Sequence, residues 1–210
     1  MKILLTGASG GIGSAIRESL EKNGARVLGF DHTNADLSSY EGVKKIDEKV
    51  DNERLDWLVC AHGFIDFETD FLKQTPENIK TTFDINTLSL FYLAQMALPR
   101  LNPGGGMIFI SSTAGLAANG RYSAYSASKA AVNALAQALA RNQPDFTFIS
   151  VCPGPTNTPM RENLAHDAAK QQSPAAVAEV IKNIIEGQGD YKSGDIIVVK
   201  NGEVSKAGNI

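Results

Sequence analysis

Tyr125 and Lys129 are the two residues whose types and spacing point most directly to acid–base chemistry. They are four residues apart, so on a helix they lie one turn from each other on the same face. A free tyrosine has a pKa of about 10 and is a poor acid or base near neutrality. Because a lysine ammonium one turn away favours the phenolate, we expect Lys129 to lower the pKa of Tyr125.

Ser112 offers a hydroxyl thirteen residues before the tyrosine. It follows the apolar run 107–110, which predicts a strand, so its hydroxyl should emerge at the carboxyl end of that strand. Open α/β sheets bind their ligands at this end of the strands. A phenol, an ammonium group and a hydroxyl gathered there could transfer a proton, but the group needs a separate hydride carrier.

A glycine-rich stretch near the amino terminus, TGASGGIG at residues 6–13, predicts a place for that carrier. An apolar strand, residues 3–6, comes before it, and residues 12–20 repeat apolar side chains at helical spacing after it. Glycines let the backbone approach a ligand, and a helix amino terminus offers free N–H groups to a pyrophosphate. The alternative is a glycine turn that binds nothing, but the flanking strand and helix favour a dinucleotide site.

Asp31 follows the second predicted strand, residues 27–30. A carboxylate here can accept hydrogen bonds from the adenosine ribose hydroxyls of NAD and repel the 2′-phosphate of NADP. No arginine or lysine occurs in the glycine loop or directly after Asp31, so the sequence favours NAD over NADP. In the competing interpretation, Asp31 only begins a turn.

Three further polar residues lie in the middle of the chain. Asp36 comes five residues after Asp31, too soon for a crossover helix of about a dozen residues. His62 follows the strand 55–61 and has no partner in the pattern, so we interpret it as a packed or loop histidine and not as a catalytic base. Asn86 lies in a long apolar helix that starts at Thr75-Pro76. It is either a surface residue or a buried one whose satisfied amide has a structural or catalytic role.

Apolar strands alternate with helical segments along the whole chain, which predicts a parallel sheet with helices on both faces. We expect one domain spanning residues 1–210, a length sufficient to bury a sizeable core. A strand is predicted at residues 146–151, and the stiff turn PGPTNT at residues 153–158 leaves its carboxyl end toward the same crevice. Residues 196–199 are predicted to be the last strand.

The composition argues against several other classes of protein. Apolar residues make up 43% of the chain and charged residues 20%, as in ordinary globular proteins, and the net charge of −3 gives no basic field for nucleic acid or anionic lipid. No apolar run approaches the roughly 18 residues of a membrane span, and the start predicts no secretory signal, so we expect a cytoplasmic protein. Cys60 and Cys152 are interpreted as buried thiols, not a disulfide or metal pair, and no metal site is predicted.

Together, these motifs resemble the short-chain dehydrogenase/reductase family. The family has a T-G-x-x-x-G-x-G turn, a helix asparagine, a serine about a dozen residues before a Y-x-x-x-K pair, and a P-G turn. The matching residues are Thr6, Gly7, Gly11, Gly13, Asn86, Ser112, Tyr125, Lys129, Pro153, Gly154 and Thr158.

Two departures from the family pattern have structural consequences. The family's N-N-A-G sequence is replaced by CAHG at residues 60–63, which affects a bracing position of the sheet. The family's helix and third strand after the acidic residue are missing, so we expect either six strands or a residual strand at Asp36. The segment between Pro155 and Ser173 is also brief, which suggests an open pocket.

The resemblance implies a doubly wound Rossmann-type α/β domain with a parallel sheet of six or seven strands. It also implies hydride transfer between a nicotinamide cofactor and a carbonyl or alcohol carbon. Tyr125 would give or take the proton, Lys129 would hold the phenolate and bind the nicotinamide ribose, and Ser112 would bind the substrate oxygen. Asn86 would position a water that links Lys129 to solvent.

The resemblance further implies a small-molecule substrate and a homodimer or homotetramer joined through the helices that begin near Asn86 and Tyr125. Two alternatives stay open: a catalytically silent dinucleotide-binding sensor or partner protein, and an NADPH-linked ketoreductase. The expected cofactor contacts are Gly7, Ser9, Gly11, Ile12, Gly13, Asp31, Asp36, Leu37, Ala61, Gly63, Tyr125, Lys129, Pro153, Gly154, Thr156 and Thr158.

Overall fold

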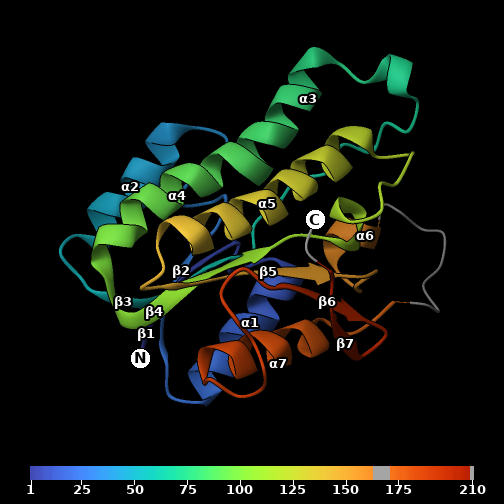
Figure 1. The fold of residues 1–210 in the computed structure, drawn as a ribbon. Helices are drawn as coiled ribbons and strands as arrows, with labels where there is room; N and C mark the ends of the chain where they lie inside the picture. Colours follow the sequence, from blue (N-terminus) through green and yellow to red (C-terminus); the bar gives the residue numbers. More distant parts are fainter. Residues whose placement is uncertain (163–170, 209–210) are drawn as a thin grey trace.

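A seven-stranded sheet runs through the centre of the protein (Figure 1). The computed structural model describes residues 1–162 and 171–208. The strand order is β2-β1-β3-β4-β5-β6-β7, and only the pairing of β6 with β7 is antiparallel among these neighbours. The strands are β1 (Lys2–Thr6), β2 (Arg26–Phe30), β3 (Leu55–Cys60), β4 (Leu101–Ile110), β5 (Thr147–Pro153), β6 (Ile196–Lys200) and β7 (Glu203–Lys206).

Helices cover both faces of this sheet, which confirms the doubly wound arrangement predicted from the alternating pattern. Figure 1 shows α2, α4 and α5 on one face and α1 and α7 on the other, and α1 and α7 pack against each other. The helices are α1 (Gly11–Lys22), α2 (Tyr40–Val50), α3 (Pro76–Phe83), α4 (Ser89–Ala97), α5 (Ser123–Asn142), α6 (Pro159–Glu162) and α7 (Pro174–Ile185).

The core consists of two apolar layers, one on each face of the sheet. Successive side chains of a strand point to opposite faces, so β4 divides its residues between the layers. Met107 and Phe109 pack with residues of α2, α4 and α5, whereas Ile108 and Ile110 pack with residues of α1 and α7. A strand that is buried on both faces needs apolar residues throughout, which explains the continuous apolar runs in the sequence.

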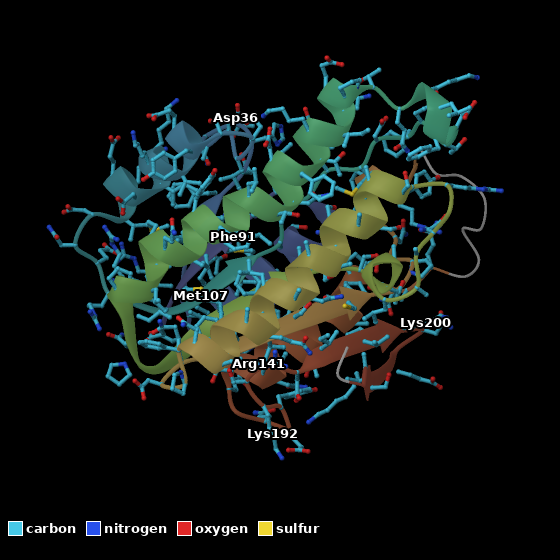
Figure 2. The ribbon with its side chains drawn as sticks, turned by 45° about the horizontal axis from the view of Figure 1, so that its top comes forward. Asp36, Phe91, Met107, Arg141, Lys192 and Lys200 are labelled. Atoms are coloured by element: carbon cyan, nitrogen blue, oxygen red, sulfur yellow. The ribbon has the colours of Figure 1, made fainter. Side chains whose placement is uncertain are left out.

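The expectation of a residual third strand at Asp36 is wrong, because this residue lies in the short connection between β2 and α2 (Figure 2). Its carboxylate accepts hydrogen bonds from the Ser38 N–H at 2.9 Å and the Ser38 hydroxyl at 2.7 Å. Ser39 then caps α2, its hydroxyl accepting a hydrogen bond from the Gly42 N–H at 3.3 Å. β2 therefore stands at the edge of the sheet.

The strand predicted at residues 196–199 is confirmed as β6 (Ile196–Lys200), but the expectation that it is the last strand is wrong. β7 follows β6 and pairs with it through a tight turn at Asn201 and Gly202, which have φ values of 55° and 80°. Two successive residues with positive φ are typical of a two-residue hairpin turn, and Asn-Gly is its commonest sequence. All four residues of β7 are exposed, so the apolar pattern used to predict the other strands is absent there.

The long helix predicted to start at Thr75-Pro76 is interrupted by a π turn. Thr75 caps α3 as predicted, accepting from the Asn78 N–H at 3.2 Å, and Pro76 is the first helical residue. Asp84–Leu88 then form a π turn before α4 continues. Such turns are rare and frequently occur at functional sites, and this one contains Asn86.

Candidate active site

Tyr125 and Lys129 occupy the first two turns of α5, which begins at Ser123. The Lys129 ammonium nitrogen lies 5.8 Å from the centroid of the Tyr125 ring, so the two side chains share a face of the helix as predicted. Tyr125 is partly exposed and Lys129 is buried. Tyr125 as a whole therefore keeps some contact with solvent, whereas Lys129 lies in the interior of the protein.

The expectation that Lys129 lowers the pKa of Tyr125 is wrong for this structure. Burial is the largest influence and raises the pKa of Tyr125, because a phenolate loses more hydration than a phenol does. The Ser112 side chain and the charge of Arg161 act in the opposite direction without reversing the shift. Tyr125 is thus protonated near neutral pH.

The Lys129 ammonium group is directed toward the end of β4. It donates a hydrogen bond to the main-chain oxygen of Ile110 at 2.8 Å. Burial lowers the pKa of Lys129 from 10.5 to about 8, although the nearby thiols of Cys152 and Cys60 act to raise it. Lys129 is therefore a buried cation whose charge is less stable than that of an exposed lysine.

Ser112 lies just beyond the carboxyl end of β4, where the sequence predicts it. Its hydroxyl accepts a hydrogen bond from the Ala114 N–H at 3.1 Å. A hydrogen bond between the Ser112 and Tyr125 side chains acts to lower the pKa of Tyr125. The preceding residue, Ser111, donates its hydroxyl to the main-chain oxygen of Lys129 at 2.8 Å. These contacts join the end of β4 to the start of α5.

Asn133 anchors α5 one turn beyond Lys129 and was missed by the sequence analysis. It is fully buried, and its side-chain oxygen accepts from the Ser150 hydroxyl at 2.6 Å and the Cys152 thiol at 3.3 Å, both on β5. The available signal was its position four residues after Lys129, which places it on the same buried face. The helix that carries the tyrosine and lysine is thereby held to the sheet at a fixed position.

Asn86 is 1% exposed, which decides between the surface and buried interpretations. Its side-chain nitrogen donates to the Phe64 carbonyl at 2.8 Å and to the Ser128 hydroxyl at 3.0 Å, and its oxygen accepts from the Phe64 N–H at 2.7 Å. Added at Gly63, a β-carbon would lie 3.4 Å from both the Asn86 oxygen and the Lys129 ammonium. Asn86, Gly63 and Lys129 are thus in close proximity, and a water relay through Asn86 stays a prediction.

At the start of α1, the backbone N–H groups of the glycine turn are not capped by a side chain. Gly7 has a φ of 72°, and a β-carbon on Gly13 would lie 1.9 Å from the Gly7 oxygen, so neither position accepts a side chain. No side chain caps α1 at Gly10, whereas serine or threonine caps α2, α3 and α7. The first-turn N–H groups, which include those near Ile12, have no helical partner and fit an anion such as a pyrophosphate.

Asp31 lies beside the glycine turn, and it does begin a local turn. Its carboxylate accepts from the Thr33 N–H at 2.9 Å and from the Thr33 hydroxyl, and these hydrogen bonds are the main reason that its pKa is lowered. The Ser9 hydroxyl of the glycine turn adds to this lowering. The carboxylate is therefore ionised and close to the place expected for an adenosine ribose.

Arg17 is a second charged residue in this region that the sequence analysis overlooked. A β-carbon added at Gly29 of β2 would lie 3.5 Å from a guanidinium nitrogen of Arg17. Arg17 also donates to Glu21 at 2.9 Å. The search for basic residues was confined to the glycine loop and the position after Asp31, so it did not include a side chain that reaches β2 from α1.

The turn that follows β5 approaches the glycine turn from the other side. A β-carbon on Gly11 would lie 2.6 Å from the Thr158 methyl group. Gly154 donates its N–H to Val199 at 2.8 Å, and the Thr156 hydroxyl donates to the Gly154 oxygen at 2.9 Å. Pro153 ends β5 immediately before this turn. The predicted cofactor residues of the two turns are thus brought together.

The other predicted cofactor contacts are distributed less uniformly. Asp36 is exposed and could contact an adenine with its side chain. The Leu37 side chain packs in the core, so Leu37 could contact an adenine only through its backbone. Ala61 ends the β3 region and donates its N–H to the Thr6 oxygen at 3.0 Å. Part of the segment between Pro155 and Ser173, whose brevity suggested an open pocket, lies outside the described residues.

Cys60 and Cys152 are free, buried thiols, as interpreted from the sequence. Burial raises the pKa of both, that of Cys60 to about 12. Across residues 1–162 and 171–208, no group of three or more His, Cys, Asp or Glu side chains could hold a metal ion. No helix in the described part of the chain is long and apolar enough to cross a membrane.

Comparison with known proteins finds relatives along most of the chain. A family model described as enoyl-(acyl carrier protein) reductase matches residues 31–199. A tropinone reductase homolog of Arabidopsis thaliana is 33% identical over 197 residues, which cover 80% of this chain and 72% of that protein. A 3-oxoacyl-[acyl-carrier-protein] reductase of Mycobacterium tuberculosis is 27% identical, with 95% of this chain and 91% of that protein covered.

Solved structures match over almost the whole chain. A short-chain dehydrogenase of Shigella flexneri complexed with NADP is 26% identical, has a TM-score of 0.82 and covers 94% of this chain and 95% of that one. A 3-ketoacyl-(acyl-carrier-protein) reductase of Brucella melitensis complexed with NADH has a TM-score of 0.89 at 18% identity, with 96% and 97% covered. The chain therefore belongs to the short-chain dehydrogenase/reductase family. It is an NAD(P)-dependent oxidoreductase of that family.

Proposed function

We propose that this protein, as one NAD(P)-binding domain over residues 1–210, interconverts a carbonyl compound and its alcohol with Tyr125 as the proton donor and acceptor. The observation that carries the proposal is the convergence of three groups. The phenol of Tyr125 interacts with the Ser112 side chain, and its ring lies over the buried Lys129 ammonium. These groups stand at the carboxyl end of the sheet beside a glycine turn that fits a pyrophosphate.

A nicotinamide cofactor supplies or accepts the hydride in this proposal. In the direction of reduction, the Tyr125 O–H transfers its proton to the substrate oxygen as the carbonyl carbon gains the hydride. The Ser112 hydroxyl donates a hydrogen bond to the same oxygen, where negative charge develops. The Lys129 ammonium then stabilises the Tyr125 phenolate that forms, and oxidation follows the same steps in reverse.

We infer that NAD is the preferred cofactor. The ionised carboxylate of Asp31 stands beside Ser9 of the glycine turn and would repel a 2′-phosphate while accepting hydrogen bonds from ribose hydroxyls. One observation favours the alternative of an NADPH-linked ketoreductase, namely the guanidinium group of Arg17 next to β2. Measuring the dissociation constants of NADH and NADPH by fluorescence titration decides between the two.

The substrate class that we propose is a ketone. The names of the curated relatives refer to tropinone and 3-oxoacyl groups, both of which contain a ketone. The test is a panel of ketones and alcohols, assayed with NADH and with NADPH by absorbance of the reduced nicotinamide. Turnover of a panel member supports the proposal. Tight cofactor binding with no turnover of any member would favour the alternative of a catalytically silent sensor or partner protein.

We also propose that two or four copies associate through α4 and α5. Leu88 of the π turn is 41% exposed and Phe91 of α4, labelled in Figure 2, is 44% exposed, so an apolar surface is available there. Light scattering of the wild type should give the mass of a dimer or tetramer. Phe91→Asp should lower it to that of a monomer, whereas Leu72→Asp, in an exposed residue of another segment, should not.

A further inference from the structure

His62 forms hydrogen bonds through both nitrogens of its ring. Nδ1 lies 2.6 Å from the hydroxyl oxygen of Thr6, the last residue of β1 before the glycine turn. Nε2 lies 2.8 Å from the hydroxyl oxygen of Ser89, the first residue of α4 after the π turn. The imidazole therefore connects the cofactor turn to the helix segment that carries Asn86.

The tautomer of His62 follows from its partners. The Ser89 hydroxyl donates its only proton to the Ile85 oxygen at 2.7 Å, so it must accept a proton from His62 Nε2. Nδ1 is then unprotonated and accepts from the Thr6 hydroxyl. Burial lowers the pKa of His62 to about 3, in agreement with a neutral ring. His62 is thus neither a proton donor nor a proton acceptor for a substrate near neutral pH.

The backbone on either side of His62 is closely packed against both parts of the site. A β-carbon on Gly7 would lie 2.5 Å from the His62 main-chain nitrogen. The next residue, Gly63, has the Lys129 ammonium and the Asn86 oxygen each 3.4 Å from the position of an added β-carbon. A shift of the His62 backbone would therefore move the glycine turn and the surroundings of Lys129 together.

We propose that His62 is a positioning residue that keeps the cofactor turn and the Lys129–Asn86 group in register through its hydrogen bonds to Thr6 and Ser89. This inference rests on the proposed function of the site. His62 does not touch the reacting atoms; it acts by fixing the backbone of Gly63 and Gly7. A displacement of about 1 Å in a site of this kind can cost about a hundredfold in rate, so the loss of these bonds should affect turnover as well as stability.

The test compares His62→Ala with His62→Gln, because a glutamine amide presents an acceptor and a donor that can replace those of the imidazole. Ser89→Ala and the His62→Ala/Ser89→Ala double variant complete a double-mutant cycle. Ile46→Val serves as the control for general destabilisation, because Ile46 is fully buried in α2 of the core away from these contacts. Measured for each variant are the thermal midpoint, the NADH dissociation constant, kcat and KM.

We expect His62→Ala to lower kcat/KM about tenfold to a hundredfold and to weaken NADH binding, and His62→Gln to restore most of both. Ser89→Ala should add little to His62→Ala, because both remove the same connection. The inference is overturned if His62→Ala lowers only the thermal midpoint and has the same kinetics as Ile46→Val. It is also overturned if the losses of kcat/KM in His62→Ala and Ser89→Ala add in the double variant. If the wild type binds neither NADH nor NADPH, the proposed function fails and this inference with it. If the wild type binds NADH and turns over a substrate, and His62→Ala has the same kcat/KM and NADH dissociation constant, this inference alone is refuted.

Discussion

The ammonium nitrogen of Lys129 donates a hydrogen bond to the main-chain oxygen of Ile110 at 2.8 Å. Lys129 belongs to α5 and Ile110 ends β4, so this bond joins a helix to a strand at the carboxyl end of the sheet. The group is buried, and its positive charge has lost most of its hydration. The position that makes Lys129 useful beside Tyr125 therefore carries a cost in stability.

Replacing Lys129 by methionine should stabilise the fold while it abolishes turnover. Burial lowers the pKa of Lys129 from 10.5 to about 8, so the unfolded chain binds more protons than the folded chain between these values. The cost of burying the charge is fully present below about pH 8 and disappears as pH rises through 10.5. In urea unfolding at neutral pH, Lys129→Met should gain about 2 kcal/mol, and the gain should shrink toward alkaline pH. A Lys129→Met variant that is less stable than the wild type at both neutral and alkaline pH would contradict this prediction.

The rate of ketone reduction should fall on the alkaline side of about pH 8. Reduction needs a protonated Tyr125, which its raised pKa provides, and a charged Lys129, which loses its proton in this range. The measurement is kcat/KM for a ketone substrate from about pH 6 to about pH 10, which reports groups of the free enzyme. A rate that increases steadily across this range would show that Lys129 is not needed as a cation.

Gly13→Ala should prevent cofactor binding and weaken the fold. The added β-carbon would lie 1.9 Å from the Gly7 oxygen, so the glycine turn must move. We expect a loss of about 1 to 3 kcal/mol in unfolding experiments and no measurable NADH binding. Gly208→Ala is the control, because a β-carbon at Gly208 meets no atom within 4 Å. Normal NADH binding by Gly13→Ala would place the cofactor elsewhere.

Cofactor preference should depend on opposing effects of Asp31 and Arg17. Asp31→Ser removes the charge that repels a 2′-phosphate, so the dissociation constant of NADPH should fall and that of NADH should rise, changing their ratio about tenfold. Arg17→Ala should weaken NADPH binding in both the wild type and the Asp31→Ser background. Titrations of both nucleotides measure the ratio. An unchanged ratio in Asp31→Ser would remove Asp31 as the determinant.

Most elements of the fold could be predicted from the sequence because their strands are buried on both faces. The runs at residues 3–6, 55–61 and 107–110 are mostly apolar, with Thr6 and Asp56 as exceptions, and they coincide with β1, β3 and the second half of β4 in the structure. The exposed strand β7 has no such signal, and its Asn-Gly turn was the only local indication. The π turn at Asp84–Leu88 was not predicted, because such turns are rare and occur as single turns within an otherwise α-helical pattern.

In the candidate site, contacts between residues close in sequence could be predicted, whereas contacts between residues distant in sequence could not. Tyr125 and Lys129 are neighbours on one helix, so their spacing was sufficient to pair them. The hydrogen bonds of His62 to Thr6 and Ser89 span 56 and 27 residues of sequence, and nothing in the spacing indicates them. The pKa of Tyr125 depends mainly on burial, which a local comparison with Lys129 does not take into account.

The most direct test of the proposed mechanism is Tyr125→Phe, which removes the phenol oxygen and keeps the ring. With NADH and the best substrate of the ketone and alcohol panel, turnover should fall by about a hundredfold to ten-thousandfold. The NADH dissociation constant should stay within about threefold of that of the wild type, well under the tenfold change that corresponds to about 1.4 kcal/mol. Turnover equal to that of the wild type would contradict the account, because another group would then have to donate the proton.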